Sequence, residues 1–223
     1  MRQLICIMLI ACAVACKSKQ QDSVRIAKEI NKDKLDTGSN VPMNEDSVGG
    51  TIAVEKTDAD FSVEAANGGM IEIQLAALAK TKAVNNRVKN FAAMMIEDHN
   101  RISAELKRIA TAKNITLPEA LSNEAKNEID RLGKKEKTEF DRAYMNMMVK
   151  DHRNDVAEFK RMVRDSKDPA LREFVKETLP ILQKHLDSAN AINKAYSTGA
   201  RETDATYPYY NKNAMAYLLQ FNV

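Results

Sequence analysis

From residue 57 onward, hydrophobic positions recur every three or four residues, which is the spacing of an α-helix. A first stripe joins Phe61, Ala65, Gly68, Ile71, Leu75 and Leu78. A second, after a break near residues 81–86, joins Val88, Phe91, Met95, His99, Ile102, Leu106 and Ile109. A third joins Tyr144, Met148, His152, Val156, Phe159 and Val163, and a fourth joins Leu171, Phe174, Thr178, Leu182, His185, Ala189, Ile192 and Tyr196. The pattern predicts four long helices.

The segment between the second and third predicted helices is long enough to cross a bundle from end to end. It holds a shorter helical stretch from Pro118 to Leu132, followed by Gly133 and the charged run KKEK. Two helical hairpins joined by a long connector are the arrangement of a ferritin-like bundle with one crossover. We therefore predict an all-α, ferritin-like four-helix bundle with a helical crossover connector over residues 58–196. An up-down-up-down bundle is the alternative.

Two adjacent glycines, Gly68 and Gly69, interrupt the first stripe. Glycine inside a helix lowers its stability, so its presence there needs a reason. We expect the pair to allow the close approach of a neighbouring helix.

Residues 1–16, MRQLICIMLIACAVAC, carry one early positive charge and then an apolar run that ends at a cysteine. The run is too short to span a bilayer and is typical of a signal peptide. The cysteine before polar sequence resembles the acylated residue of bacterial lipoproteins. We favour Cys16, where the hydrophobic run ends, over Cys12 as the lipidation site. We predict an exported protein that is lipid-anchored in the outer membrane or cell envelope, with its domain facing the periplasm or exterior. A plain secretory signal is the alternative.

Residues 17–57 are polar and lack a sustained period, so we predict a flexible linker there, with at most a helical turn or two between Val24 and Ile30. All three cysteines lie in the leader, so the predicted domain has no disulfide. Residues 197–223 form a C-terminal tail with several aromatic residues, which either packs on the bundle or binds an envelope protein partner.

The charge distribution excludes one class of partner. The formal net charge is +3, from 34 Lys and Arg residues against 31 Asp and Glu residues, and the two signs are interspersed. Nucleic-acid binding needs a concentrated basic face, so we predict no nucleic-acid partner.

The sequence spells nearly the same phrase twice, MMIEDH at residues 94–99 and MMVKDH at residues 147–152. With His185, these phrases hold all three histidines of the chain, one on each of the last three stripes. Each histidine lies about 15 to 18 residues from a predicted interhelical turn, or roughly 25 Å along a helix. The three side chains are therefore predicted to share one layer at mid-height. Glu64 of the first helix is predicted to reach the same layer.

Such a layer is a candidate site for Zn²⁺ or another transition metal ion, with Glu64, His99, His152 and His185 as ligands. Asp98 and Asp151 precede two of the histidines and point away from them, so each can orient an imidazole on a neighbouring helix. The alternative is a set of buried histidines that hydrogen-bond carboxylates across helices and specify packing without a metal.

Five segments, in order along the chain, resemble a known family: FSVEAANGGMIEIQLAALA, FAAMMIEDH, ITLP, EFDRAYMNMMVKDH and TLPILQKHLDSA. The family is domain-of-unknown-function family 4142, a group of predicted bacterial outer-membrane proteins placed in the ferritin-like superfamily. The resemblance covers about residues 57–196 and implies an all-α ferritin-like bundle with the two Asp-His phrases as hallmarks. It implies no established activity. The connector LGKKEKTEFD departs from the family pattern, which commonly has a small residue and Gly before the Phe-Asp pair.

Ferritin-like ancestry suggests a di-iron site, but the residues argue against one. Such sites use Glu-x-x-His motifs, and the positions three before the histidines are the apolar Ile96, Val149 and Leu182. We recognise no catalytic constellation and expect no enzymatic activity. We predict an envelope-anchored, non-enzymatic binding or structural protein. A metal-binding bundle for sequestration or stress protection is the alternative.

Overall fold

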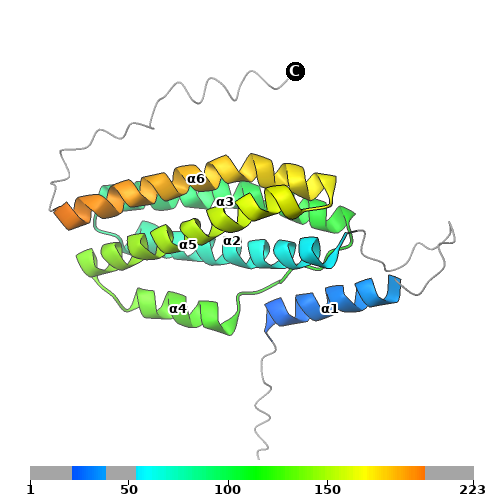
Figure 1. Ribbon diagram of the computed structural model, residues 1–223. Coiled ribbons are helices and arrows are strands. Elements are labelled where there is room, and N and C mark those ends of the chain that lie inside the picture. Colours follow the sequence, from blue (N-terminus) through cyan, green and yellow to red (C-terminus); the bar gives the residue numbers. More distant parts are fainter. Residues whose placement is uncertain (1–21, 39–53, 199–223) are drawn as a thin grey trace, which may run out of the picture.

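The computed structural model describes residues 22–38 and 54–198, with side chains described as far as residue 196, and this part of the chain is helical without strands. Its helices are α1 Ser23–Gly38, α2 Lys56–Lys82, α3 Asn86–Ala112, α4 Asn123–Gly133, α5 Lys137–Asp165 and α6 Pro169–Thr198. Figure 1 shows α2, α3, α5 and α6 as a four-helix bundle, with α1 and α4 along one side. The predicted all-α bundle is confirmed.

Contacts at the two ends of the bundle establish the crossover. At one end, the turn between α2 and α3 lies against the start of α5, because the backbone N–H groups of Val84 and Asn85 donate to Asp141 at 3.2 and 2.9 Å. At the other end, Lys113, just after α3, pairs with Asp168 in the turn between α5 and α6 at 2.6 Å. The connector therefore runs the whole length of the bundle, and α3 is parallel to α5. This is the ferritin-like topology, and it excludes the up-down-up-down alternative.

Individual helix ends follow from their capping residues. Asp168 caps α6, since its Oδ1 accepts from the backbone N–H groups of Ala170 and Leu171 at 2.9 and 3.0 Å, and Pro169 occupies the first helical position. In the connector, Ser122 caps α4 by accepting from the N–H of Ala125, so this helix begins later than the predicted Pro118. Within the described residues, no helix is both long and apolar enough to cross a membrane.

The flexible linker predicted over residues 17–57 is wrong for α1. The Asn31 side chain is buried and makes two hydrogen bonds to the backbone of Thr116, donating to its C=O at 2.9 Å and accepting from its N–H at 2.7 Å. Ser23 Oγ accepts from the N–H groups of Glu119 and Ala120. The sequence pattern did not show this, because α1 is held mainly by polar contacts and buries only one apolar side chain fully, that of Ala27.

The hydrophobic core forms two clusters. One gathers around Phe91, Met95, Tyr144 and Met148, and the other around Phe61, Leu106, Phe159 and Phe174. The paired methionines of the repeated phrases belong to the first cluster, with Met95 and Met148 fully buried and Met94 and Met147 packed against it. These methionines therefore fill the core, which is the usual role of this flexible side chain.

The two glycines of α2 differ in their surroundings. A Cβ at Gly69 would lie 3.1 Å from Ser103 Oγ of α3, so this residue does permit close approach of the two helices. A Cβ at Gly68 would have no neighbour within 4 Å. The predicted close approach explains Gly69 and leaves Gly68 unexplained by packing.

We expect Gly68→Ala to raise the free energy of unfolding by up to about 1 kcal/mol, because alanine reduces the entropy cost of forming the helix and meets no neighbour here. Gly69→Ala is the matched control, since its Cβ is crowded by Ser103 and the gain is offset. The urea midpoints of both variants measure the difference. Equal midpoints would contradict the assignment of open space to Gly68.

Candidate metal centre

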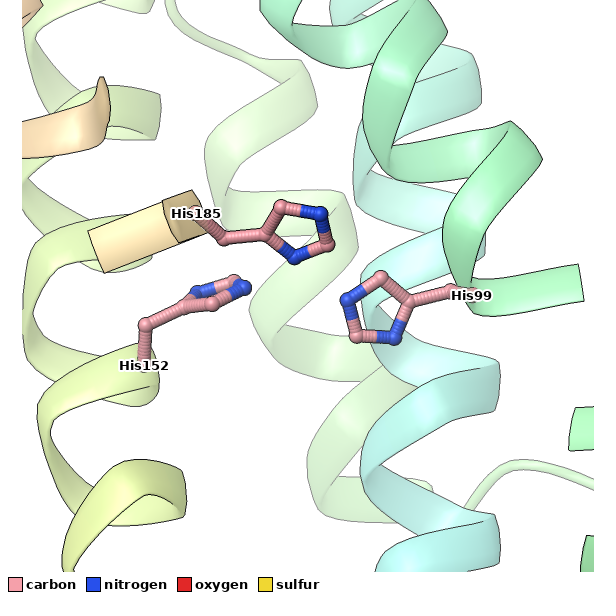
Figure 2. Close-up of side chains that lie close together, drawn as sticks. All are labelled: His99, His152 and His185. Carbon is pink, nitrogen blue, oxygen red and sulfur yellow. The ribbon is translucent and has the colours of Figure 1, made fainter. Parts of the chain in front are cut away.

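The three histidines come together in the interior of the bundle, His99 from α3, His152 from α5 and His185 from α6. Their ring centroids are 5.8 Å apart for His99 and His152, 5.2 Å for His99 and His185, and 5.3 Å for His152 and His185. All three side chains are buried. Figure 2 shows the rings turned toward one another from their separate helices. The predicted single layer of histidines is present.

One nitrogen of each ring faces an acceptor outside the cluster. His99 Nδ1 lies 3.1 Å from Glu72 Oε2, and His152 Nδ1 lies 3.0 Å from the Met148 carbonyl and 3.3 Å from Glu72 Oε1. His185 Nε2 lies 2.9 Å from Asp98 Oδ2. The Met148 carbonyl and the ionised Asp98 only accept hydrogen bonds, so His152 Nδ1 and His185 Nε2 carry the protons, and His99 Nδ1 faces Glu72.

The remaining nitrogens are His99 Nε2, His152 Nε2 and His185 Nδ1. Each is buried and has no hydrogen-bond partner. With the proton on the opposite nitrogen, each of these atoms offers a lone pair. The three residues place one ligand nitrogen each within 4.8 Å of one another, and the rings in Figure 2 direct one nitrogen each to their common centre. Three convergent lone pairs without donors are the arrangement that a cation requires.

The protonation states of His99 and His152 suit metal binding. Burial, and then the neighbouring His185 and His152, lower the pKa of His99 well below its usual value. Burial and His185 lower the pKa of His152 to about 3. These two rings are therefore neutral at physiological pH, as metal ligands must be.

The carboxylate of the layer is Glu72, and the prediction of Glu64 is wrong. Glu64 lies two helical turns earlier on α2, where its side chain is 55% exposed and pairs with Lys28 of α1. Counting residues back from the turn between α2 and α3 placed the histidine layer too far from that turn along α2. The buried face of that helix runs through Glu72, Leu75, Ala76 and Ala79, and a lone glutamate on such a face was the signal that could have identified it.

The two predicted orienting aspartates have different positions. Asp98 contacts His185 on a different helix and also accepts from Arg101 at 3.1 Å. Burial raises the pKa of the Asp98 carboxyl. The hydrogen bonds to His185 and Arg101 outweigh burial and bring this pKa down to about 2. Asp151 lies near Glu128 of α4 and near Glu72 and Asp155, and burial and the charge of Glu128 raise its pKa to about 6. The structure therefore places Asp98 against an imidazole and Asp151 among other carboxylates.

A second acidic group lies beside the histidines and was not predicted. Glu72, His152 and Asp155 place one possible ligand atom each within 4.8 Å of one another. Burial, followed by the charges of Asp155 and Asp151, raises the pKa of Glu72 well above its usual value. Burial and Asp151 raise the pKa of Asp155 to about 7. Asp155 follows His152 by less than one helical turn, and this spacing was the available signal.

We expect Asp155→Asn to stabilise the metal-free protein, with a gain that grows as the pH rises from about 4 to about 7. The folded state holds a proton on Asp155 up to about pH 7, whereas the unfolded chain loses it near 3.8. The free energy of unfolding of the wild type therefore falls as the pH rises from about 4 to about 7. Asparagine does not titrate, so Asp155→Asn removes this contribution to the pH dependence. Denaturation with urea in chelator at several pH values measures it. Glu97→Gln, at an exposed site on α3, is the control, and parallel pH profiles for Asp155→Asn and the wild type would contradict the expectation.

The predicted lipidation residues Cys16 and Cys12, the leader and residues 199–223 of the predicted C-terminal tail lie outside the described residues.

Comparisons with known proteins support the fold and leave the chemistry open. The family described as domain of unknown function DUF4142 matches residues 44–192. No curated protein matches the chain. Among solved structures, the crystal structure of a DUF305 fragment from Deinococcus radiodurans is similar, with a TM-score of 0.57 and 13% sequence identity. The match covers 63% of this chain and 97% of that chain. At this identity the likeness shows the fold alone.

Proposed function

Because this chain belongs to the DUF4142 family, whose description assigns no activity, we propose from the site itself that it is a metal-binding protein. His99, His152 and His185 are the ligands of one divalent transition-metal ion. The observation that carries this proposal is the set of three buried, unpartnered ring nitrogens that face one point while the opposite nitrogens face acceptors.

The surroundings of the histidines match those of protein metal sites. Metal-binding imidazoles usually donate their other N–H to a carboxylate or backbone carbonyl, which sets the tautomer and raises ligand basicity. Glu72, the Met148 carbonyl and Asp98 supply these acceptors. Asp98, whose pKa is lowered to about 2, also supplies negative charge close to the bound cation.

The donor set selects the kind of metal. Neutral imidazole suits Zn²⁺, Cu²⁺, Ni²⁺ and Co²⁺, whereas Ca²⁺ and Mg²⁺ prefer oxygen ligands. Three histidines leave one coordination position open in a tetrahedral zinc site, where a bound ion supplies Lewis acidity. We take Zn²⁺ as the first metal to test.

The alternative, a purely structural layer, explains less. A buried polar atom without a partner costs about 1–3 kcal/mol, so three such nitrogens in one cluster are a large penalty for a packing device. Coordination of one ion satisfies all three at once.

Elemental analysis tests the proposal. The full chain, expressed without a histidine tag and purified without chelator, is expected to carry close to one equivalent of a transition metal. A strong chelator should remove the ion and lower the melting temperature, because a ligand held only by the folded state stabilises it. A metal-free protein whose melting temperature does not respond to Zn²⁺, Cu²⁺, Ni²⁺ or Co²⁺ would refute it.

Anchoring in the cell envelope is the second part of the proposal, supported by the order of leader, cysteine and polar sequence. Labelling of expressing cells with a palmitate analogue is expected to tag the wild type and not Cys16→Ser. Labelling that persists in Cys16→Ser and disappears in Cys12→Ser would move the acylation site. No labelling in the wild type would contradict the lipid anchor.

A further inference from the structure

A pocket of about 260 Å³ opens beside the metal centre, lined by residues of α2, α3, α5 and α6. Four carboxylates line it, those of Glu64, Glu72, Asp155 and Glu158, and it has no lysine or arginine among its lining residues. His99 also lines this pocket, so it reaches the histidine cluster. Carboxylate oxygens that line a hollow with partly apolar walls attract a cation.

The carboxylates are arranged by depth. Glu64 and Glu158 are 55% and 45% exposed and pair with Lys28 and Arg161 at the surface. The carboxylate of Glu72 is only 6% exposed, and Asp155 lies between these extremes. A cation that enters the pocket therefore meets exposed carboxylates first and buried ones last.

The deepest carboxylate is joined to the metal centre. Glu72 contacts the ring nitrogens of both His99 and His152, and its buried Oε1 lies 3.3 Å from His152 Nδ1 without forming a hydrogen bond. Asp155 and His152 place possible ligand atoms within 4.8 Å of those of Glu72. This oxygen, in a carboxylate pair with Asp155, offers hard oxygen ligands to a cation that still carries water.

From these contacts we propose that the pocket is the route by which a divalent metal ion reaches the three histidines, with Glu72 and Asp155 as a transfer site. The inference rests on the proposed metal-binding function and adds a second, transient cation site to it. At the transfer site, carboxylate oxygens replace water molecules of the hydrated ion. The imidazole nitrogens then replace the carboxylates, because they bind borderline transition metals more strongly.

This route also accounts for Gly68. The residue lines the pocket, and a Cβ there would meet no neighbouring atom within 4 Å. A larger side chain at this position would extend into the pocket without disturbing helix packing. Gly68→Leu is therefore a variant that narrows the route while leaving the histidines in place.

The experiment follows the uptake of Co²⁺ by the full, chelator-stripped chain, using the visible absorption that Co²⁺ acquires in a nitrogen site. In stopped-flow mixing, Gly68→Leu is expected to slow uptake, because its side chain narrows the pocket, and to reach the wild-type final absorbance. In mixing above pH 7, where Asp155 is ionised, Asp155→Asn is expected to slow uptake and weaken its dependence on salt, since it removes a charge from the route. Ala77→Leu and Glu97→Gln, at exposed positions of α2 and α3, add the same bulk or remove the same charge elsewhere and should load at the wild-type rate.

The results separate the two ideas. Wild-type uptake rates in both Gly68→Leu and Asp155→Asn, with full final absorbance, would overturn the route and leave the metal site intact. Slowing by the two exposed controls to the same degree would also overturn it. Absence of any Co²⁺ absorption in the wild type would overturn the proposed function itself.

Discussion

His185→Ala is expected to abolish stoichiometric Zn²⁺ binding and the thermal stabilisation that the ion provides. At free metal 1,000-fold above its Kd, a ligand held only by the folded state contributes about 4 kcal/mol. For a domain of this size that corresponds to roughly 8–16 °C in melting temperature. His99→Ala and His152→Ala should behave alike, since each supplies one of the three convergent nitrogens.

The control for the histidine variants is Tyr144→Phe. Tyr144 is fully buried in the neighbouring apolar cluster and its hydroxyl also lacks a hydrogen-bond partner; burial and the charge of Glu72 raise its pKa, but Tyr144 is not one of the residues that place a ligand atom at the cluster. Removing this hydroxyl should leave metal binding and its stabilisation intact. Calorimetric melting with and without Zn²⁺ gives the comparison. If the three histidine variants and the control responded to Zn²⁺ alike, the histidines could not be the ligands.

The second large effect is expected at Glu72. Glu72→Ala should weaken Zn²⁺ binding by about 10- to 100-fold, as is typical for the loss of a carboxylate that orients ligand imidazoles. The effect is large because this one side chain contacts the ring nitrogens of both His99 and His152. Competition with a chromophoric chelator measures the Kd.

Glu64→Ala is the matched control, because it removes the same side chain from the same helix at an exposed position paired with Lys28. It should leave the equilibrium affinity at the wild-type value. Equal losses in the two variants would mean that the effect comes from net charge rather than from the contacts of Glu72. If only Glu64→Ala weakened Zn²⁺ binding, the result would support Glu64, the carboxylate predicted from the sequence.

The histidine layer could be predicted because it depends on quantities that are local in sequence. Each histidine lies on a hydrophobic stripe, and each lies at a similar distance from a turn, so helical geometry alone places the three at one height. Glu72 was missed because its selection depends on the rotation of α2 against α3 and α5, which differs from the rotation implied by the first stripe. The count of residues from the turn then favoured Glu64, which faces α1 instead.

Other features are determined by contacts between distant parts of the chain. The docking of α1 rests on the hydrogen bonds of Asn31 and Ser23 to backbone groups near residue 116, and such polar contacts leave no periodic signal. Asp155 belongs to the site only because α2 brings Glu72 to it. Gly68 and Gly69 are adjacent and alike in sequence, yet one faces Ser103 and the other faces the pocket.

The sequence by itself therefore determined the four bundle helices, the long connector and a layer that holds every histidine of the chain, because helical period and turn distance are encoded residue by residue. Only the tertiary structure decided which nitrogen of each ring faces inward, which glutamate accompanies the histidines and where the pocket opens. These depend on how the helices rotate and pack against one another, and a rotation of one residue, about 100°, moves a side chain from the core to the surface.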